Sequence, residues 1–288
     1  MKEIVVLSGK GGTGKTSITA ALGVAAGGQA VVVDCDVDAA NLHILYQPQN
    51  EQVHEFYSGK LAVIDYKTCS ACGVCEEKCR FDAIQFEDGR YVIDEVSCEG
   101  CSVCSHLCPE KAITMIENKT GNWYQSRSRF NHWFVHARLG IGQENSGKLV
   151  SKVKQEAKKL AETEHIPYLI VDGPPGVGCP VISVFSGTSH VLIVTEATRS
   201  GLHDLKRLVE LIDFFKAAAS CVINKYDLNE TITREIEAFC RAHRIAVINR
   251  IPYNGIFSAA LRNNQTLMEA GDPMIIDKIN EIWNHLKT

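Results

Sequence analysis

Eight cysteines form two copies of one spacing, C-x2-C-x2-C-x3-C. The copies are Cys69, Cys72, Cys75 and Cys79, and Cys98, Cys101, Cys104 and Cys108. In this spacing three thiolates bind one cubane iron–sulfur cluster, and the fourth cysteine binds the other cluster. We therefore predict two [4Fe–4S] clusters. The first is held by Cys69, Cys72, Cys75 and Cys108, and the second by Cys98, Cys101, Cys104 and Cys79. Structural zinc is the alternative, but zinc sites usually pair two C-x-x-C units at a longer separation.

The cysteine-rich segment, residues 65–118, repeats internally. The pair Ala83-Ile84 recurs as Ala112-Ile113 at the same offset as the cysteines, and the segment holds 5 basic and 11 acidic residues. It resembles a bacterial two-cluster ferredoxin, which implies an inserted α+β domain. Pro109 follows the last cysteine of the second copy, whereas Arg80 stands at the matching position of the first. That difference removes no ligand but changes the surroundings of one cluster.

A phosphate-binding loop occupies residues 9–16, GKGGTGKT. Its glycines let backbone N–H groups close on phosphate, Lys15 suits the outer phosphates, and the Thr16 hydroxyl suits Mg²⁺. The loop follows an apolar run and precedes a helical pattern, which is the order that such loops require. The predicted nucleotide-binding residues are Gly11, Gly12, Thr13, Gly14, Lys15, Thr16 and Ser17.

Lys10 is an additional lysine that this motif does not explain. The pattern K-G-G-T-G-K-T resembles the deviant phosphate loop of the MinD/ParA class of ATPases, which includes the nitrogenase iron protein and Mrp-type carriers. The resemblance implies that Lys10 reaches the nucleotide of a partner across an ATP-dependent homodimer, or a heterodimer with a paralogue. There it stabilises the charge that develops in phosphoryl transfer, as an arginine finger does.

Two aspartates lie in segments that resemble the switches of this class. In VVVDCDVDAANLH, the resemblance implies that Asp36 positions the attacking water and lies at the magnesium site; Asp34 and Asp38 are close enough in sequence to be alternatives. In YLIVDGPPG, Asp172 is suited to hold a magnesium-bound water. Capping of a following helix is the alternative role for each aspartate.

Further site residues follow from the same resemblance. Asn224 in VINK and Pro252 in RIPY resemble the elements that contact adenine. The predicted catalytic residues are therefore Lys10, Lys15 and Asp36, and the magnesium ligands are Thr16, Asp36 and Asp172.

Short apolar runs alternate with amphipathic segments along the rest of the chain. The runs are 3–8, 30–34, 168–173, 190–196, 220–225 and 245–253, and the helical segments include 146–164, 200–218 and 231–243. This alternation predicts an α/β fold with a parallel sheet covered on both faces. We expect a MinD-like P-loop NTPase domain in 1–64 and 119–288, interrupted by the ferredoxin domain in 65–118.

Composition argues against several classes of protein. The net charge is −4, which does not favour a nucleic-acid surface. No apolar run reaches eighteen residues, and the final helical pattern, 273–288, lacks the basic excess of a membrane-binding helix. We therefore expect a protein that binds neither nucleic acid nor membrane. Twelve cysteines without a secretion signal favour metal or redox chemistry in a reducing compartment, so we also expect a cytoplasmic protein.

Three other features have simpler explanations. Cys35, Cys221 and Cys240 lie in apolar patterns and are expected in the core. Cys179 has a spacing from Asp172 similar to that of a cluster cysteine in the nitrogenase iron protein, but the second cysteine of that site has no counterpart. Residues 119–140 mix aromatic and basic side chains and predict a hairpin whose aromatics pack on the cysteine segment; single-stranded nucleic acid is the alternative partner.

The predicted function is that of a dimeric, magnesium-dependent ATPase that couples ATP to two [4Fe–4S] clusters. The coupling serves ATP-gated electron transfer to a redox partner, or iron–sulfur-dependent assembly of a metalloprotein. One alternative is a carrier that delivers clusters to apoproteins. The others are a positioning ATPase of the MinD or ParA kind and an amide ligase with the same nucleotide fold.

Overall fold

The computed structural model describes residues 1–140, 142 and 146–288 and divides into two compact units. The first, here called the sheet unit, comprises Met1–His54, Trp123–Arg138 and Ser146–Thr288. The second, the cysteine unit, comprises Glu55–Asn122 and Leu139–Asn145. The segment 65–118 lies within the cysteine unit.

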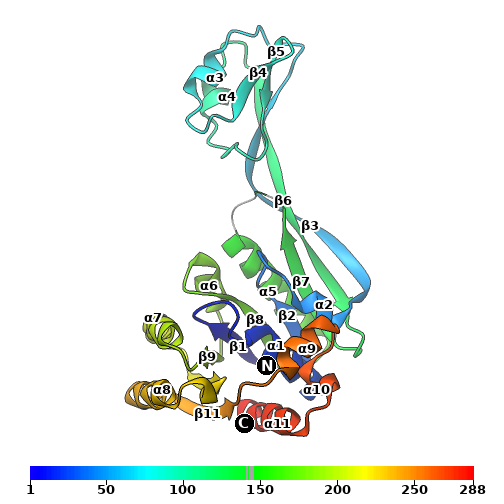
Figure 1. The fold of residues 1–288 in the computed structure, drawn as a ribbon. Helices are drawn as coiled ribbons and strands as arrows, with labels where there is room; N and C mark the ends of the chain where they lie inside the picture. Colours follow the sequence, from blue (N-terminus) through cyan, green and yellow to red (C-terminus); the bar gives the residue numbers. More distant parts are fainter. Residues whose placement is uncertain (141, 143–145) are drawn as a thin grey trace. The chain divides into compact units, whose positions relative to one another are not determined.

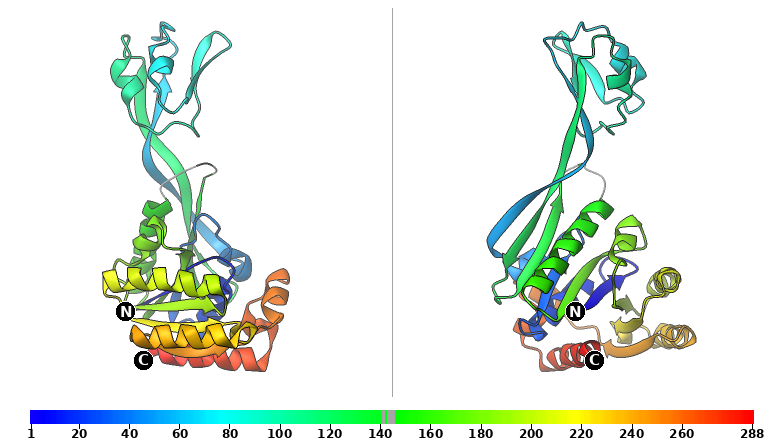
Figure 2. Two further views of the ribbon diagram at one scale, coloured as in Figure 1. Left: turned by 60° about the vertical axis from the view of Figure 1, so that its left-hand side comes forward. Right: turned by 180° about the vertical axis from the view of Figure 1, so that it is seen from behind.

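A nine-stranded sheet has the order β11-β10-β9-β1-β8-β2-β7-β6-β3 (Figures 1 and 2). Its strands are β1 (Lys2–Ser8), β2 (Ala30–Asp34), β3 (Gln49–Ile64), β6 (Ile113–Arg127), β7 (Trp133–Leu139), β8 (Tyr168–Pro175), β9 (His190–Glu196), β10 (Ala219–Asn224) and β11 (Ala246–Ile251). The pairings among β11, β10, β9, β1, β8, β2 and β7 are all parallel. The predicted parallel α/β sheet is confirmed. β3 and β6 contain residues of both units.

Helices cover both faces of the parallel strands, since β2 is buried at every position and β1 at nearly every one. They are α1 (Lys15–Ala25), α2 (Leu42–Tyr46), α5 (Ser146–Thr163), α6 (Cys179–Val184), α7 (Arg199–Phe215), α8 (Glu230–Ala242), α9 (Ile256–Arg262), α10 (Leu267–Ala270) and α11 (Pro273–Lys287), with a short 3₁₀ helix at Tyr226–Leu228. Helix α11 begins after Asp272, whose carboxylate accepts from the N–H groups of Met274 and Ile275. Its apolar side packs in the core with α1.

Strands β6 and β7 are neighbours joined by a tight turn, in which the Ser128 N–H donates to the His132 carbonyl at 2.8 Å. The predicted hairpin is therefore present. Its aromatic rings, however, pack within the sheet unit: Phe134 and Phe130 meet Tyr46, with ring centroids 5.2 and 5.8 Å apart. The expectation that these rings pack on the cysteine segment is wrong, because α1 and α2 leave an apolar surface that they fill.

The cysteine unit keeps the internal repeat in its backbone. Helices α3 (Val74–Lys78) and α4 (Val103–Leu107) occupy matching places in the two copies, and β4 (Ile84–Glu87) pairs with β5 (Arg90–Ile93) in antiparallel fashion. The Asp65 N–H donates to the Ala112 carbonyl at 2.7 Å, and the equivalent Asp94 N–H donates to the Ala83 carbonyl at 2.8 Å. Each copy thus completes the other, so neither half is self-sufficient.

The remaining cysteines and helices agree with the simpler expectations. Cys35, Cys221 and Cys240 are fully buried, which confirms their place in the core, and Cys179 is exposed. Within the described ranges, no helix combines the length and apolarity needed to cross a bilayer.

His136 on β7 is buried among aromatic rings. Tyr124, Phe134 and His43 stack on it, with centroids 4.6, 4.8 and 6.0 Å away. Burial, and then repulsion from His43 and Arg138, lowers the pKa of His136 to about 3. The Glu51 carboxylate lies 3.5 Å from Nε2, but it is partly exposed and does not offset the burial.

Acid should therefore destabilise the sheet unit through His136. The neutral ring is compatible with the fold at pH above 6.5, and stability falls as the pH drops from 6.5 toward 3, because only the unfolded chain gains the proton. At pH 5 this costs about 2 kcal/mol. His136→Phe should remove that part of the loss in denaturant titrations at pH 7.5 and 5, whereas exposed His203→Gln should not. An unchanged pH dependence in His136→Phe would contradict this.

Candidate functional site

The phosphate loop between β1 and α1 depends on glycine. Gly12 and Gly14 have φ of 78° and 92°, a region that residues with a Cβ rarely adopt. A Cβ on Gly14 would also lie 2.5 Å from Asn224 Nδ2, and one on Gly9 would lie 2.4 Å from Asp204 Cβ. The glycines therefore set both the backbone path and the close packing of the loop against the ends of β10 and α7.

Asp172, near the end of β8, organises the loop. Its Oδ1 lies 2.8 Å from Lys15 Nζ and accepts a hydrogen bond from Thr19 Oγ1 at 2.9 Å, and its Oδ2 accepts from Thr16 Oγ1 at 2.8 Å. Asp172 and Lys15 are both buried, so the ion pair is shielded from water. The structure thus brings together three residues that the sequence predicted as site residues, and it adds Thr19, which the sequence did not.

The three aspartates after β2 differ in their surroundings. Asp34 is fully buried and accepts from the N–H groups of Asp36 and Leu42 at 3.0 and 3.1 Å, so it shapes the loop and the start of α2. Burial, and next repulsion from Asp172, raises its pKa to about 8. Asp38 is exposed. Asp36 alone of the three lines the loop cavity, with its carboxylate 4.0 Å from Lys15 Nζ.

A cavity of about 630 Å³ opens at the phosphate loop. All seven predicted loop residues from Gly11 to Ser17 line it, together with Asn224, whose Nδ2 donates to the Thr13 carbonyl at 2.8 Å. Pro252 is not among the lining residues. Phe257 and Leu261 of α9 line that wall instead, and the only signal for them in the sequence was an apolar helix following RIPY.

Lys10 does not line this cavity. Its Nζ lies 2.6 Å from Glu196 Oε1 and donates to Ser200 Oγ at 2.7 Å, so in the single chain it is bound by residues of β9 and α7. Neither partner was identified from the sequence.

The eight repeat cysteines surround two separate cavities in the cysteine unit. Cys69, Cys72, Cys75 and Cys108 line one, of about 330 Å³ including space open to solvent. Cys98, Cys101, Cys104 and Cys79 line the other, of about 360 Å³. Each cavity therefore draws three cysteines from one copy and the last cysteine from the other.

No single-ion site is found at the cysteine cavities among the described residues. Among the side chains that the structure describes, no three of the His, Cys, Asp and Glu residues are grouped closely enough to share one metal ion. The Ala112 N–H donates to Cys108 Sγ at 3.3 Å, a contact that favours a thiolate.

Residues 4–267 match the family model of the CobQ/CobB/MinD/ParA nucleotide-binding domain. The chain belongs to this family. The prediction of a MinD/ParA-class ATPase is confirmed at this level, and so is its parallel-sheet P-loop fold.

Relatives and solved structures of similar fold span nearly the whole chain. An uncharacterized protein of Methanocaldococcus jannaschii, MJ0578, is 31% identical over 99% of this chain and 96% of its own length. The septum site-determining protein MinD from Pyrococcus horikoshii, complexed with Mg-ADP, has a TM-score of 0.59 at 17% identity, covering 100% of this chain and 96% of that one. The Cyanothece McdA(D38A)–ATP complex has a TM-score of 0.55 at 16% identity, with 100% and 96% covered.

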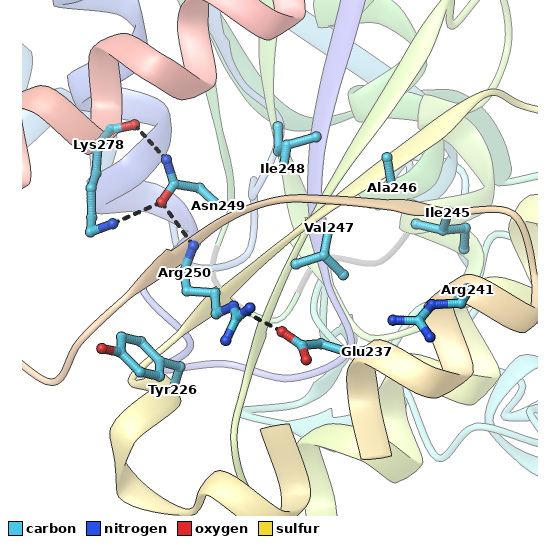
Figure 3. Close-up of a pocket in the computed structure, with 10 residues that line it drawn as sticks. All are labelled: Tyr226, Glu237, Arg241, Ile245, Ala246, Val247, Ile248, Asn249, Arg250 and Lys278. Atoms are coloured by element: carbon cyan, nitrogen blue, oxygen red, sulfur yellow. Dashed lines mark hydrogen bonds and ion pairs between the residues drawn. The ribbon is translucent and has the colours of Figure 1, made fainter. Parts of the chain in front are cut away.

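A second large hollow, of about 680 Å³, lies along the edge strand β11 between α8 and α11 (Figure 3). Two of its basic groups have partners within the hollow: Arg250 Nε lies 2.8 Å from Glu237 Oε1, and Lys278 Nζ donates to Asn249 Oδ1 at 3.2 Å. The hollow has no glycine loop among its lining residues and therefore differs from the phosphate-loop cavity.

Gly14→Ala should abolish or weaken nucleotide binding by at least about tenfold, because the left-handed backbone alone costs about 1–2 kcal/mol with a Cβ and the methyl group meets Asn224. Gly255→Ala is the matched control, since a Cβ there meets nothing within 4 Å. Titration with a fluorescent ATP analogue measures both. Wild-type affinity in Gly14→Ala would show that the described loop is not the binding conformation.

Proposed function

We propose that this chain is a magnesium-dependent ATPase whose nucleotide state is coupled to two [4Fe–4S] clusters held by its eight repeat cysteines. One observation carries the proposal: each of two cavities is lined by the four cysteines that the sequence spacing assigns to one cluster. The crossed grouping is the one expected of two-cluster ferredoxin spacing.

The surroundings of the cysteines also fit clusters. In a cubane each thiolate binds a different iron atom, so the four sulfurs lie farther apart than the ligands of one zinc ion. Small residues beside the cysteines, Ser70 and Gly73 in one cavity and Gly100 and Ser102 in the other, leave room for a compact inorganic group. When bound, the clusters supply one-electron chemistry.

The nucleotide chemistry belongs to the sheet unit. Gly11–Gly14 present backbone N–H groups to the phosphates, and Lys15 places its charge beside the outer ones. Thr16 and Asp172 are already hydrogen-bonded to each other and would hold Mg²⁺ and its water, whereas Asp36 faces the cavity as the residue that positions the attacking water. The similar MinD from Pyrococcus horikoshii is complexed with Mg-ADP, which supports this use of the site.

The connection between the two functions is covalent. Asp36 precedes α2, only Gln47 and Pro48 separate α2 from β3, and β3 continues into the cysteine unit. A movement of the segment that senses ATP is thus passed to a strand that carries the cysteine unit. Thermodynamic linkage requires the reverse effect as well, so cluster state alters nucleotide affinity.

The proposal includes partners and location. Two copies, or this chain and a paralogue, associate in the presence of ATP, and the clusters serve a redox protein or a metalloprotein that requires iron–sulfur chemistry. The thiols require the reducing cytoplasm. We propose no role for nucleic acid or membrane.

A positioning ATPase is the second candidate, because a septum site-determining MinD is among the structures of similar fold. That function needs a membrane or nucleic-acid surface and leaves the eight paired cysteines unexplained. Binding to acidic vesicles or DNA with Mg-ATP would favour it.

The experiment that tests the proposal starts from anaerobically purified protein. The protein is incubated with Mg-ATP and an apo-ferredoxin, re-isolated and assayed for iron. Retention of both clusters favours permanent redox centres. ATP-dependent loss to the acceptor would make the protein a cluster carrier, and a preparation that never holds iron would overturn the proposal.

Cys75→Ser should lower iron and acid-labile sulfide from about eight to about four per chain, because it removes one ligand of one cluster. ATP binding should remain. Exposed Cys179→Ser, outside both cavities, is the control and should keep all the iron. Equal iron in Cys75→Ser and wild type would contradict the assignment.

Lys10→Ala should bind nucleotide normally but lose ATP-dependent self-association. Its turnover should fall by at least about a hundredfold, because a cation that stabilises the transition state in trans acts as an arginine finger does. Sedimentation and phosphate release measure the two effects. Turnover equal to wild type would show that Lys10 does not act in trans.

A further inference from the structure

Glu196, the last residue of β9, binds two lysines at once. Its Oε1 lies 2.6 Å from Lys10 Nζ and its Oε2 lies 2.8 Å from Lys225 Nζ. The Glu196 side chain is 10% exposed, whereas the side chains of Lys10 and Lys225 are 30% and 27% exposed, so the carboxylate is the more shielded end of each ion pair. The sequence assigned no role to Glu196 or Lys225.

Lys10 is held by more than this carboxylate. Its Nζ also donates to Ser200 Oγ at 2.7 Å and to Thr198 Oγ1 at 3.4 Å. Thr198 caps helix α7 by accepting from the Gly201 N–H, which fixes its hydroxyl. Three residues of one β9–α7 turn therefore bind the Lys10 ammonium group inside its own chain.

Lys225 extends the contact to the phosphate loop. Its Nζ donates to the Gly12 carbonyl at 3.0 Å as well as to Glu196. Gly12 and Lys225 line the loop cavity. Glu196 thus connects Lys225, which lines the loop cavity, with Lys10, which does not.

The charge on Glu196 is stable in this arrangement. Burial raises the pKa of its carboxyl, but hydrogen bonds from Lys10 and Lys225 outweigh burial and lower it below the ordinary value. The phosphates of a nucleotide at Gly12 are anionic, so they repel this carboxylate and attract its lysine partners.

We propose that Glu196 is a positioning residue that retains Lys10 in its own chain and so weakens association with a second copy. This inference rests on the proposed action of Lys10 in trans. A Lys10 that is held in its own chain cannot enter a partner's site. The apparent association constant between copies is therefore the intrinsic constant multiplied by the fraction of chains in which Lys10 is free.

Glu196→Gln is the direct test, because it removes the charge and keeps the shape. With magnesium and a non-hydrolysable ATP analogue, sedimentation should show a dimer dissociation constant roughly threefold to tenfold lower than that of wild type. Glu235→Gln is the control. It removes a carboxylate of α8 that lies 4.0 Å from Arg199 at the start of α7, and it should leave the dissociation constant unchanged. An unchanged or weaker dimer in Glu196→Gln would overturn the inference.

Two further measurements separate this inference from the function on which it rests. If Lys10→Ala dimerises like wild type, the action in trans is wrong. If Lys10→Ala fails to dimerise while Glu196→Gln behaves like wild type, only the restraint by Glu196 is wrong. Acetylation of Lys10 in the nucleotide-free monomer, followed by mass spectrometry, should be faster in Glu196→Gln; an equal rate would show that Glu196 does not hold the amine.

Discussion

The buried carboxylate of Asp172 binds Lys15, Thr16 and Thr19 at the point where β8 meets the phosphate loop. A buried carboxylate and ammonium need each other, since either one alone would be an uncompensated charge in the core. The pair therefore fixes the loop against the sheet. Burial, and next repulsion from Asp172, raises the pKa of neighbouring Asp34, so the electrostatics after β2 depend on a residue of β8.

The cysteine unit depends on a different constraint, which is reciprocal pairing between two copies of one motif. The crossed hydrogen bonds of Asp65 and Asp94 place the last cysteine of each copy beside the first three of the other. An insertion built this way needs two closely spaced attachment points, and the neighbouring strands β3 and β6 supply them. This explains how the cysteine unit can interrupt an ATPase chain without disturbing the parallel strands.

Local patterns predicted those parts of the molecule that depend on local chemistry. The glycine loop and the cysteine groupings follow from spacing within one segment, and the structure brings their members together. Asp172 was assigned by resemblance, and it lies beside Lys15 and Thr16 of the loop. The hairpin of β6 and β7 was predicted, but its contacts with Tyr46 were not, because they depend on the apolar surface left by α1 and α2. Pro252 was assigned by resemblance, whereas Phe257 lines the cavity. Glu196 was missed because a glutamate that ends an apolar strand has no local pattern that identifies its partners.

The central claim is that nucleotide state and cluster state affect each other. Its most direct test is the midpoint potential of the clusters, measured by anaerobic redox titration with and without saturating Mg-ATP. We predict a shift of about 59 mV for each tenfold difference in ATP affinity between the oxidised and reduced protein, with the affinity difference measured independently. Identical potentials, together with identical ATP affinities in both redox states, would contradict the coupling.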